Sequence, residues 1–229
     1  MLSKVSDSGS AWYPVPIKKL DTLLIKAIYS GRGYSHPYAL RRNIAYNLQY
    51  LEYLDRTVQD LKLSSVLLTQ TWKSFVIAGC GIIESLLHYL LIANGAHAKT
   101  KWDLVAVAPG NSKTWDGEVR KVDSHVYKKR SSPRLEQMRF DAMIKKSESK
   151  KVLGCEHSIY PLLKKLRPLR NKFHLQEIGN VVDTDWNAFN WSEACFMAQV
   201  IQRVFTSTIF NPNADERGYF DYLSRYHEI

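Results

Sequence analysis

One apolar segment limits what this chain can fold into more than any other part of the sequence. It runs from about Val66 to Ala93, its apolar residues cover most of a helix circumference, and Asn94-Gly95 follows as a stop signal. From Phe75 to Ala93 the segment is long enough to span a bilayer, but Glu84 and His88 lie near its middle. We therefore expect a buried helix at the centre of a bundle, and no membrane span.

The rest of the chain predicts further helices. Apolar residues spaced three and four apart from Leu40 to Leu61 predict a long amphipathic helix, and Ser64 and Ser65 are suited to cap the helix that follows. We expect other helices over about 17–29, 134–152, 158–176, 191–210 and 215–226. Helices joined by short turns imply an all-α bundle, which we divide into an N-terminal extension, 1–37, and a helical domain, 38–229.

The segment 96–133 reads as a basic, partly irregular insertion into that bundle. Turn signals at Pro109-Gly110-Asn111 and Asp116-Gly117 interrupt it, and Lys101–Val107 has the composition of a short strand. From Lys99 to Lys151 there are 14 Lys/Arg and 7 Asp/Glu, which accounts for most of the net charge of +10. Such a surplus fits a surface that steers a polyanionic substrate, and it equally fits a solvated loop.

Composition and cysteine usage narrow the class of protein. Hydrophobic residues make up 45% of the 229 residues, so the chain is able to form a normal core. The three cysteines are isolated and form no Cys-x-x-Cys pair, which argues against a disulfide framework and a zinc site. The N-terminus has no apolar core of signal-peptide type. We expect a cytoplasmic protein without a metal or cofactor.

Four polar residues gather on one side of the helix predicted over 158–176. On a helical wheel, Arg167, Arg170 and Asn171 lie within about 60° of His174, beside an apolar stripe that contains Ile159, Leu162, Leu166, Leu169 and Phe173. Pro168 lies inside this helix and favours a kink or a restart. A solvated helix face is the ordinary interpretation of such a pattern.

These residue types also suit cleavage of RNA, which carries its own nucleophile in the 2′-hydroxyl. An imidazole at His174 is able to accept that proton or to protonate the leaving oxygen. The guanidinium groups of Arg167 and Arg170 are suited to hold the phosphate, and the amide of Asn171 to orient the reacting groups. The reaction requires no metal.

The segment from Arg167 to Gln176 resembles the signature of HEPN domains, an Arg followed by four to six residues and a His, often with Asn directly after the Arg. Phe75–Leu87 is similar to the early HEPN helix, where Glu84 stands for an acidic residue of the same polar site. The resemblance implies a helical bundle, a homodimer with a composite active site, and a metal-independent endoribonuclease of a toxin–antitoxin or antiviral defence system. It assigns catalysis to Glu84, Arg167, Arg170, Asn171 and His174, with RNA and an antitoxin or defence partner protein as the partners.

The spacing within this signature leaves a second reading open. Three residues separate Arg170 from His174, one fewer than usual, and six separate Arg167 from His174. A HEPN-type module that binds RNA or protein without cleavage is the alternative, and a structural protein that docks an acidic partner through Lys99–Lys151 is a third. Because Glu84 lies in an apolar helix, we expect it to pair with Arg170 or Arg167 if it is buried.

Overall fold

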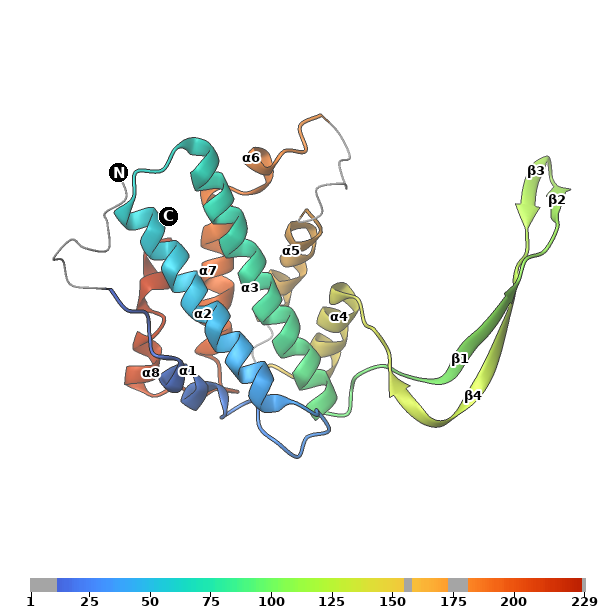
Figure 1. The fold of residues 1–229 in the computed structure, drawn as a ribbon, viewed down its shortest axis with the longest axis horizontal. Helices are drawn as coiled ribbons and strands as arrows, with labels where there is room; N and C mark the ends of the chain where they lie inside the picture. The colour runs from blue at the N-terminus through green and yellow to red at the C-terminus, as the bar shows by residue number, and fades with distance from the viewer. Residues whose placement is uncertain (1–11, 155–157, 173–180, 228–229) are drawn as a thin grey trace. The chain divides into compact units, whose positions relative to one another are not determined.

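The computed structural model describes residues 12–154, 158–172 and 181–227, and the chain divides into two compact units (Figure 1). The ribbon unit is His97–Met138, and the helical unit is formed by the described residues before and after it. The helical unit contains α1 (Ile17–Leu24), α2 (Pro37–Asp60), α3 (Ser65–Ala93), α4 (Phe140–Lys150), α5 (Ile159–Asn171), α6 (Asp185–Ala188), α7 (Trp191–Phe205), α8 (Ala214–Gly218) and a 3-10 helix, η1 (Asp221–His227).

Helix α3 forms the centre of the helical unit, as expected for the most apolar segment. It packs against α2, α4, α5, α6 and α7, and 15 of its 29 residues are buried. In the part of the chain that the structure describes, α3 is the one helix long and apolar enough to cross a membrane, and 72% of its apolar window is buried inside the protein. Helix α3 is therefore a core helix of the helical unit.

The ends of the helices follow local rules in some places and depart from them in others. Helix α3 ends where the sequence predicts, because Gly95 adopts a φ of +63°, which favours glycine. Ser64 occupies the N-cap position of α3, but its side chain makes no capping hydrogen bond. Helix α5 continues through Pro168 to Asn171.

The ribbon unit overturns the expectation of an all-α fold. Strands β1 (Lys99–Ala108) and β4 (Ser124–Leu135) pair antiparallel, and β2 (Ser112–Trp115) and β3 (Glu118–Lys121) form a second small antiparallel pair. The expected strand over Lys101–Val107 lies inside β1. Its partner was missed because Lys128-Lys129-Arg130-Ser-Ser-Pro reads locally as a loop, whereas strand pairing is decided by the distant segment. The helix expected from residue 134 begins only at Phe140.

The segment 1–37 contributes to the core through α1. Leu20, Leu23 and Leu24 are buried. The guanidinium of Arg41, on α2, donates to the carboxylate of Asp21 at 2.8 Å and to the carbonyl oxygen of Ile28 at 3.0 Å. This buried cation therefore joins the N-terminal helix to the bundle with its charge compensated.

Two neighbouring glycines of α3 allow the packing of this core to be tested. A Cβ on Gly79 would fall well inside van der Waals contact of the buried Met197 side chain on α7, whereas a Cβ on Gly81 meets nothing within 4 Å. Both Gly→Ala substitutions gain helix propensity, about 1 kcal/mol, so their difference isolates the clash. We expect Gly79→Ala to be less stable than Gly81→Ala by about 1–3 kcal/mol in urea denaturation. Equal stabilities would contradict the close approach of α3 and α7.

Candidate functional site

The candidate site lies at the C-terminal end of α5. Ile159, Tyr160, Leu163 and Leu166 are the buried residues of this helix, while Leu162 and Leu169 are only half-buried. The buried stripe is therefore rotated slightly from the one that the helical wheel gives. Arg170 is half-buried, Arg167 and Asn171 are exposed, and His174 lies outside the described residues, as does Phe173.

An ion pair joins α5 to the central helix. The Nε atom of Arg170 lies 3.5 Å from an Oε atom of Glu84 on α3, and the two side chains are 40% and 30% exposed. Of the two partners expected for Glu84, Arg170 is the one observed. The packing of α3 against α5 thus brings together two predicted site residues that are 86 positions apart in the sequence.

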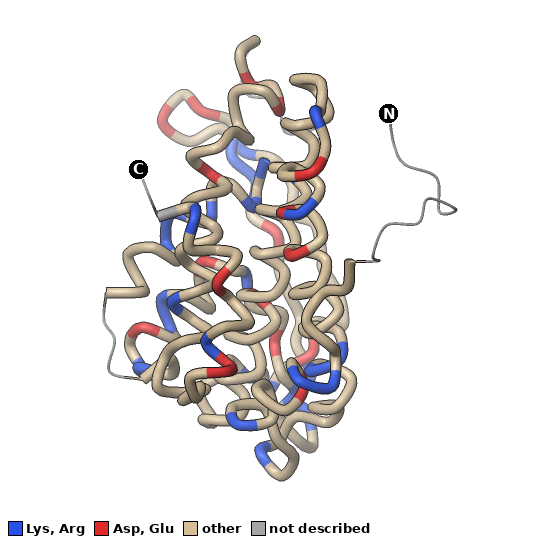
Figure 2. The backbone as a smooth tube through the Cα atoms, turned by 90° about the vertical axis from the view of Figure 1, so that its left-hand side faces the viewer, with Lys and Arg blue, Asp and Glu red and all other residues tan. Residues whose placement is uncertain are grey.

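Arg167 lies in a different environment from Arg170. Its guanidinium is 3.7 Å from the carboxylate of Asp141 on α4. Lys172, the next basic residue after Arg170, has its amino group 3.3 Å from the carboxylate of Asp183. The cations at this end of α5 therefore alternate with carboxylates from other segments, and Figure 2 shows the same interspersion of charges over the helices. The structure joins Arg170 to Glu84 and joins Arg167 to a separate acid.

Cys80 lies on α3 one turn before Glu84. Burial raises the pKa of its thiol to about 12, and the charge of Glu84 adds to this while Arg170 opposes it. Cys80 is therefore a neutral, buried thiol at neutral pH and is unsuited to act as a nucleophile.

A partly open stripe of α3 passes through this site. Ala78, Gly81, Glu84 and His88 succeed one another at helical spacing, and each is at least partly exposed. Open space surrounds the position that a Cβ of Gly81 would take. The ring of His88 lies edge-on to Tyr34, with centroids 6.1 Å apart. Sequence reasoning did not assign His88 to the site, although its position four residues after Glu84 places both on one face of the helix.

A second polar cluster was not predicted from the sequence. It lies beside a hollow of about 290 Å³ that Asp55 of α2 and Arg225 of η1 help to line. The carboxylate of Asp55 is 2% exposed, pairs with Arg225 and accepts a hydrogen bond of 2.7 Å from Tyr226. Burial raises the pKa of Asp55, although Tyr226 and Arg225 oppose the shift. Asp55 and the Arg225-Tyr226 pair are 170 residues apart in the sequence, so no local pattern predicts their contact.

Comparisons of the chain with models of known protein families, with curated proteins and with solved structures find no match. Among the described residues, no group of three or more His, Cys, Asp or Glu is arranged to hold a metal ion. The groups present at the candidate site are a permanent cation in Arg170, an exposed amide in Asn171 and the carboxylate of Glu84. A guanidinium and an amide suit the binding of a phosphate, whereas proton transfer near neutral pH requires another group, such as an imidazole.

We expect the Glu84–Arg170 pair to add little to stability, because both side chains are substantially exposed. In a double-mutant cycle of Glu84→Gln and Arg170→Gln, the coupling free energy should stay below about 1 kcal/mol in urea denaturation. A coupling of several kcal/mol would instead assign the pair a mainly structural role, and a loss of function in these variants could then not be attributed to chemistry.

The Asp55 cluster should behave in the opposite way. Asp55→Ala leaves the Arg225 guanidinium and the Tyr226 hydroxyl without their buried acceptor, so we expect a loss of about 3 kcal/mol of unfolding free energy. Asp60→Ala is the matched control on the same helix, since Asp60 pairs with Arg56 at the surface. It should change stability by no more than about 0.5 kcal/mol. Similar losses in the two variants would refute the buried role of Asp55.

Proposed function

We propose that this chain is a metal-independent endoribonuclease of the HEPN type, acting as a toxin or an antiviral defence effector. The observation that carries the proposal is the contact of Arg170 with Glu84, with Asn171 next to it in the sequence. These are three of the five residues that the resemblance assigns to one polar site. Two of them come from helices that only the fold brings together.

In the proposed reaction, the 2′-oxygen of a ribose attacks the adjacent phosphorus and the 5′-oxygen of the next nucleotide leaves. A base removes the proton of the 2′-hydroxyl and an acid supplies one to the leaving oxygen, so the products are a 2′,3′-cyclic phosphate and a 5′-hydroxyl. His174 is the group proposed for proton transfer. Arg170 stabilises the charge on the phosphate oxygens, and Asn171 and Glu84 position the reacting groups.

Several features of the site support this division of roles. The ion pair engages the Nε of Arg170, and a guanidinium carries five N–H donors in all, so donors remain for a phosphate. The open stripe of α3 at Gly81 leaves room for a substrate or for a second subunit. Arg167 is paired with Asp141, so we assign phosphate binding first to Arg170. We propose a homodimer, in which each subunit contributes one His174 to a composite site.

The cellular setting is also a proposal. Cys80 and Cys195 are both buried free thiols. Thiols of this kind fit a reducing compartment, and we propose the cytoplasm, where RNA is available.

A binding module without catalysis is the second candidate, and two observations favour it. Arg170 and Arg167 both have carboxylate partners, which reduces the positive charge that each offers to a phosphate. The interval from Arg170 to His174 is also one residue shorter than the usual signature. Such a protein would bind RNA or a partner protein and leave RNA intact.

The test is cleavage of a mixed RNA pool in EDTA, with the ends of the products identified by mass spectrometry. We expect the wild type to produce 2′,3′-cyclic phosphates and His174→Ala to be slower by about 10²–10⁴-fold, because general acid–base catalysis contributes this much. His36→Ala is the matched control, since His36 is exposed at the start of α2 and lies outside the site. It should cleave like the wild type.

The remaining outcomes separate the candidates. Intact RNA with a folded wild-type protein, together with RNA binding that survives His174→Ala, selects the binding module. Cleavage that His174→Ala retains, or that ends in 3′-hydroxyls, overturns the proposed mechanism. Absence of both cleavage and RNA binding removes RNA from the function altogether.

A further inference from the structure

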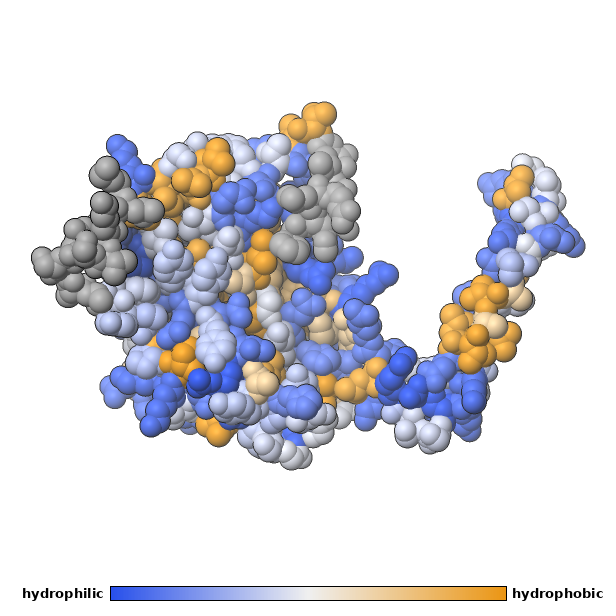
Figure 3. Space-filling view, viewed as in Figure 1, coloured by the Kyte–Doolittle hydropathy of each residue, from blue (hydrophilic) through white to orange (hydrophobic). Residues whose placement is uncertain are grey.

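The ribbon unit exposes its side chains in a way that a folded sheet rarely does. None of the residues in β1, β2, β3 and β4 is buried, and only Thr100, Asp103 and Arg130 are even half-buried. Figure 3 shows hydrophobic side chains gathered along the middle of the β1/β4 ribbon. A two-stranded ribbon is only marginally stable by itself, and apolar surface of this extent marks an interaction site.

The register of β1 and β4 defines what we call the aromatic face. Trp102 lies opposite Lys129, Leu104 opposite Tyr127, and Val107 opposite His125, and directly opposed residues of an antiparallel pair share one face. The rings of His125 and Tyr127 lie 6.3 Å apart with a tilt of 30°, which agrees with this assignment. Trp102 and Tyr127 are 52% and 54% exposed. The face therefore presents several flat rings beside a lysine.

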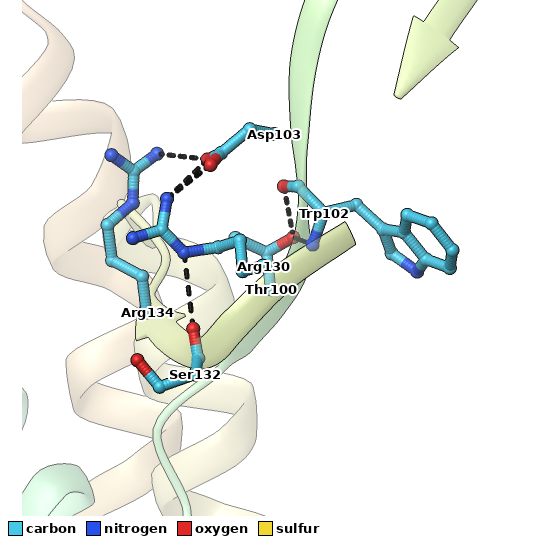
Figure 4. A network of polar contacts seen from close by, with 6 residues as sticks. All are labelled: Thr100, Trp102, Asp103, Arg130, Ser132 and Arg134. Carbon is cyan, nitrogen blue, oxygen red and sulfur yellow. Dashed lines mark hydrogen bonds and ion pairs between the residues drawn. The ribbon is translucent and has the colours of Figure 1, made fainter. Parts of the chain in front are cut away.

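The other side of the ribbon carries a polar network near the start of β1. Arg130 donates to both carboxylate oxygens of Asp103 at 2.5 Å, and Arg134 lies 3.8 Å from the same carboxylate. The hydrogen bond from Arg130 lowers the pKa of Asp103. Figure 4 shows the indole of Trp102 pointing away from this network. The indole is therefore held outward by a strand whose opposite side is fixed by ion pairs.

The charge of the ribbon unit indicates what kind of partner fits this face. His97–Met138 contains nine Lys/Arg and five Asp/Glu. Arg120, Lys121, Arg130 and Arg134 form ion pairs within the unit. The other five cations make no ion pair with any residue that the structure describes: Lys99, Lys101, Lys113, Lys128 and Lys129. Of these, Lys129 lies on the aromatic face, opposite Trp102, whereas Lys128 lies opposite Asp103 on the other face. A lysine among exposed aromatic rings, in a unit with an excess of positive charge, matches a chain of phosphates and bases.

We propose that the aromatic face of the ribbon binds single-stranded RNA. Bases stack on Trp102 and Tyr127, and a phosphate binds Lys129, because every base has a flat face and the strand between bases is anionic. This inference rests on the proposed action on RNA and names the element that captures the substrate. It requires no contact at the candidate site of α3 and α5.

Two other occupants fit the ribbon less well. A second copy of the face would bring the same excess of positive charge, so the two surfaces would repel each other. An anionic membrane fits less well because the carboxylates of Asp116, in the β2–β3 turn, and of Glu118, at the start of β3, would repel it. Phosphates and bases satisfy both the charge and the rings.

The experiment measures anisotropy of a fluorescein-labelled, uridine-rich single-stranded RNA with 2′-fluoro substituents, which removes the nucleophile and prevents cleavage. The full chain is titrated in EDTA as wild type, Trp102→Ala and Tyr127→Ala. We expect each variant to bind about 10- to 100-fold more weakly, because stacking on one aromatic contributes this much. Lys129→Gln should lower the affinity and reduce the slope of log K against log salt by about one phosphate contact.

Matched variants keep the result specific to the ring. Trp186→Ala removes a tryptophan of similar exposure, 58%, from the helical unit and should bind like the wild type. Trp102→Phe retains a flat ring and should recover most of the affinity. Unchanged binding in Trp102→Ala and Tyr127→Ala overturns the proposal, as does weak binding in Trp102→Phe equal to that in Trp102→Ala.

The remaining outcomes distinguish this inference from the proposed function. If the aromatic face binds RNA while the wild type leaves cleavable RNA intact, the ribonuclease proposal fails and the ribbon assignment stands. If the wild type cleaves RNA and the ribbon variants bind and cleave equally well, the ribbon assignment alone fails. Binding to vesicles that contain phosphatidylserine, or a wild-type dimer that Trp102→Ala dissociates, combined with no RNA binding, would replace RNA by a membrane or by a second copy.

Discussion

The burial of α3 is the constraint on which the rest of the helical unit depends. A helix that is apolar around most of its circumference is stable in water only when other segments cover it, and α2, α4, α5, α6 and α7 provide that cover. The charged side chains that the described part of the chain buries form ion pairs. Lys73 on α3, for example, is 8% exposed and lies 2.8 Å from the carboxylate of Asp185. Helix α6 thus both covers apolar surface of α3 and supplies the partner for a buried charge.

The candidate site lies where this cover is incomplete. The partly open stripe of α3 holds Gly81, Glu84 and His88, and the end of α5 brings Arg170 to it. At this boundary a carboxylate and a guanidinium remain both paired and accessible, which a fully buried pair would not allow. Arg167 is separate from this pair because its guanidinium lies beside the carboxylate of Asp141 on α4.

The ribbon unit follows the opposite principle. Its strands pair through backbone hydrogen bonds, but their side chains are not covered by a core, so Trp102, Leu104 and Tyr127 remain at the surface. Ion pairs such as Asp103–Arg130 fix one side of the ribbon and leave the rings of the other side accessible. In the proposed mechanism the two units have different roles. The ribbon unit binds single-stranded RNA, and the residues of α3 and of the end of α5 act on a phosphate.

Helices with a locally repeating pattern of apolar residues could be predicted from the sequence. The spacing of apolar residues gave α2 and α3 nearly to their ends, and Asn94-Gly95 gave the stop of α3, because periodicity and a positive φ are properties of neighbouring residues. Arg170 could also be predicted from the sequence as a partner for Glu84, although only as one of two candidates. Three contacts depend on the three-dimensional fold: Arg167 lies beside Asp141, Asp55 contacts Arg225 and Tyr226, and Ser124–Leu135 pairs with β1. Each of these contacts joins segments distant in the chain, and its free energy depends on burial and pairing that no local pattern encodes.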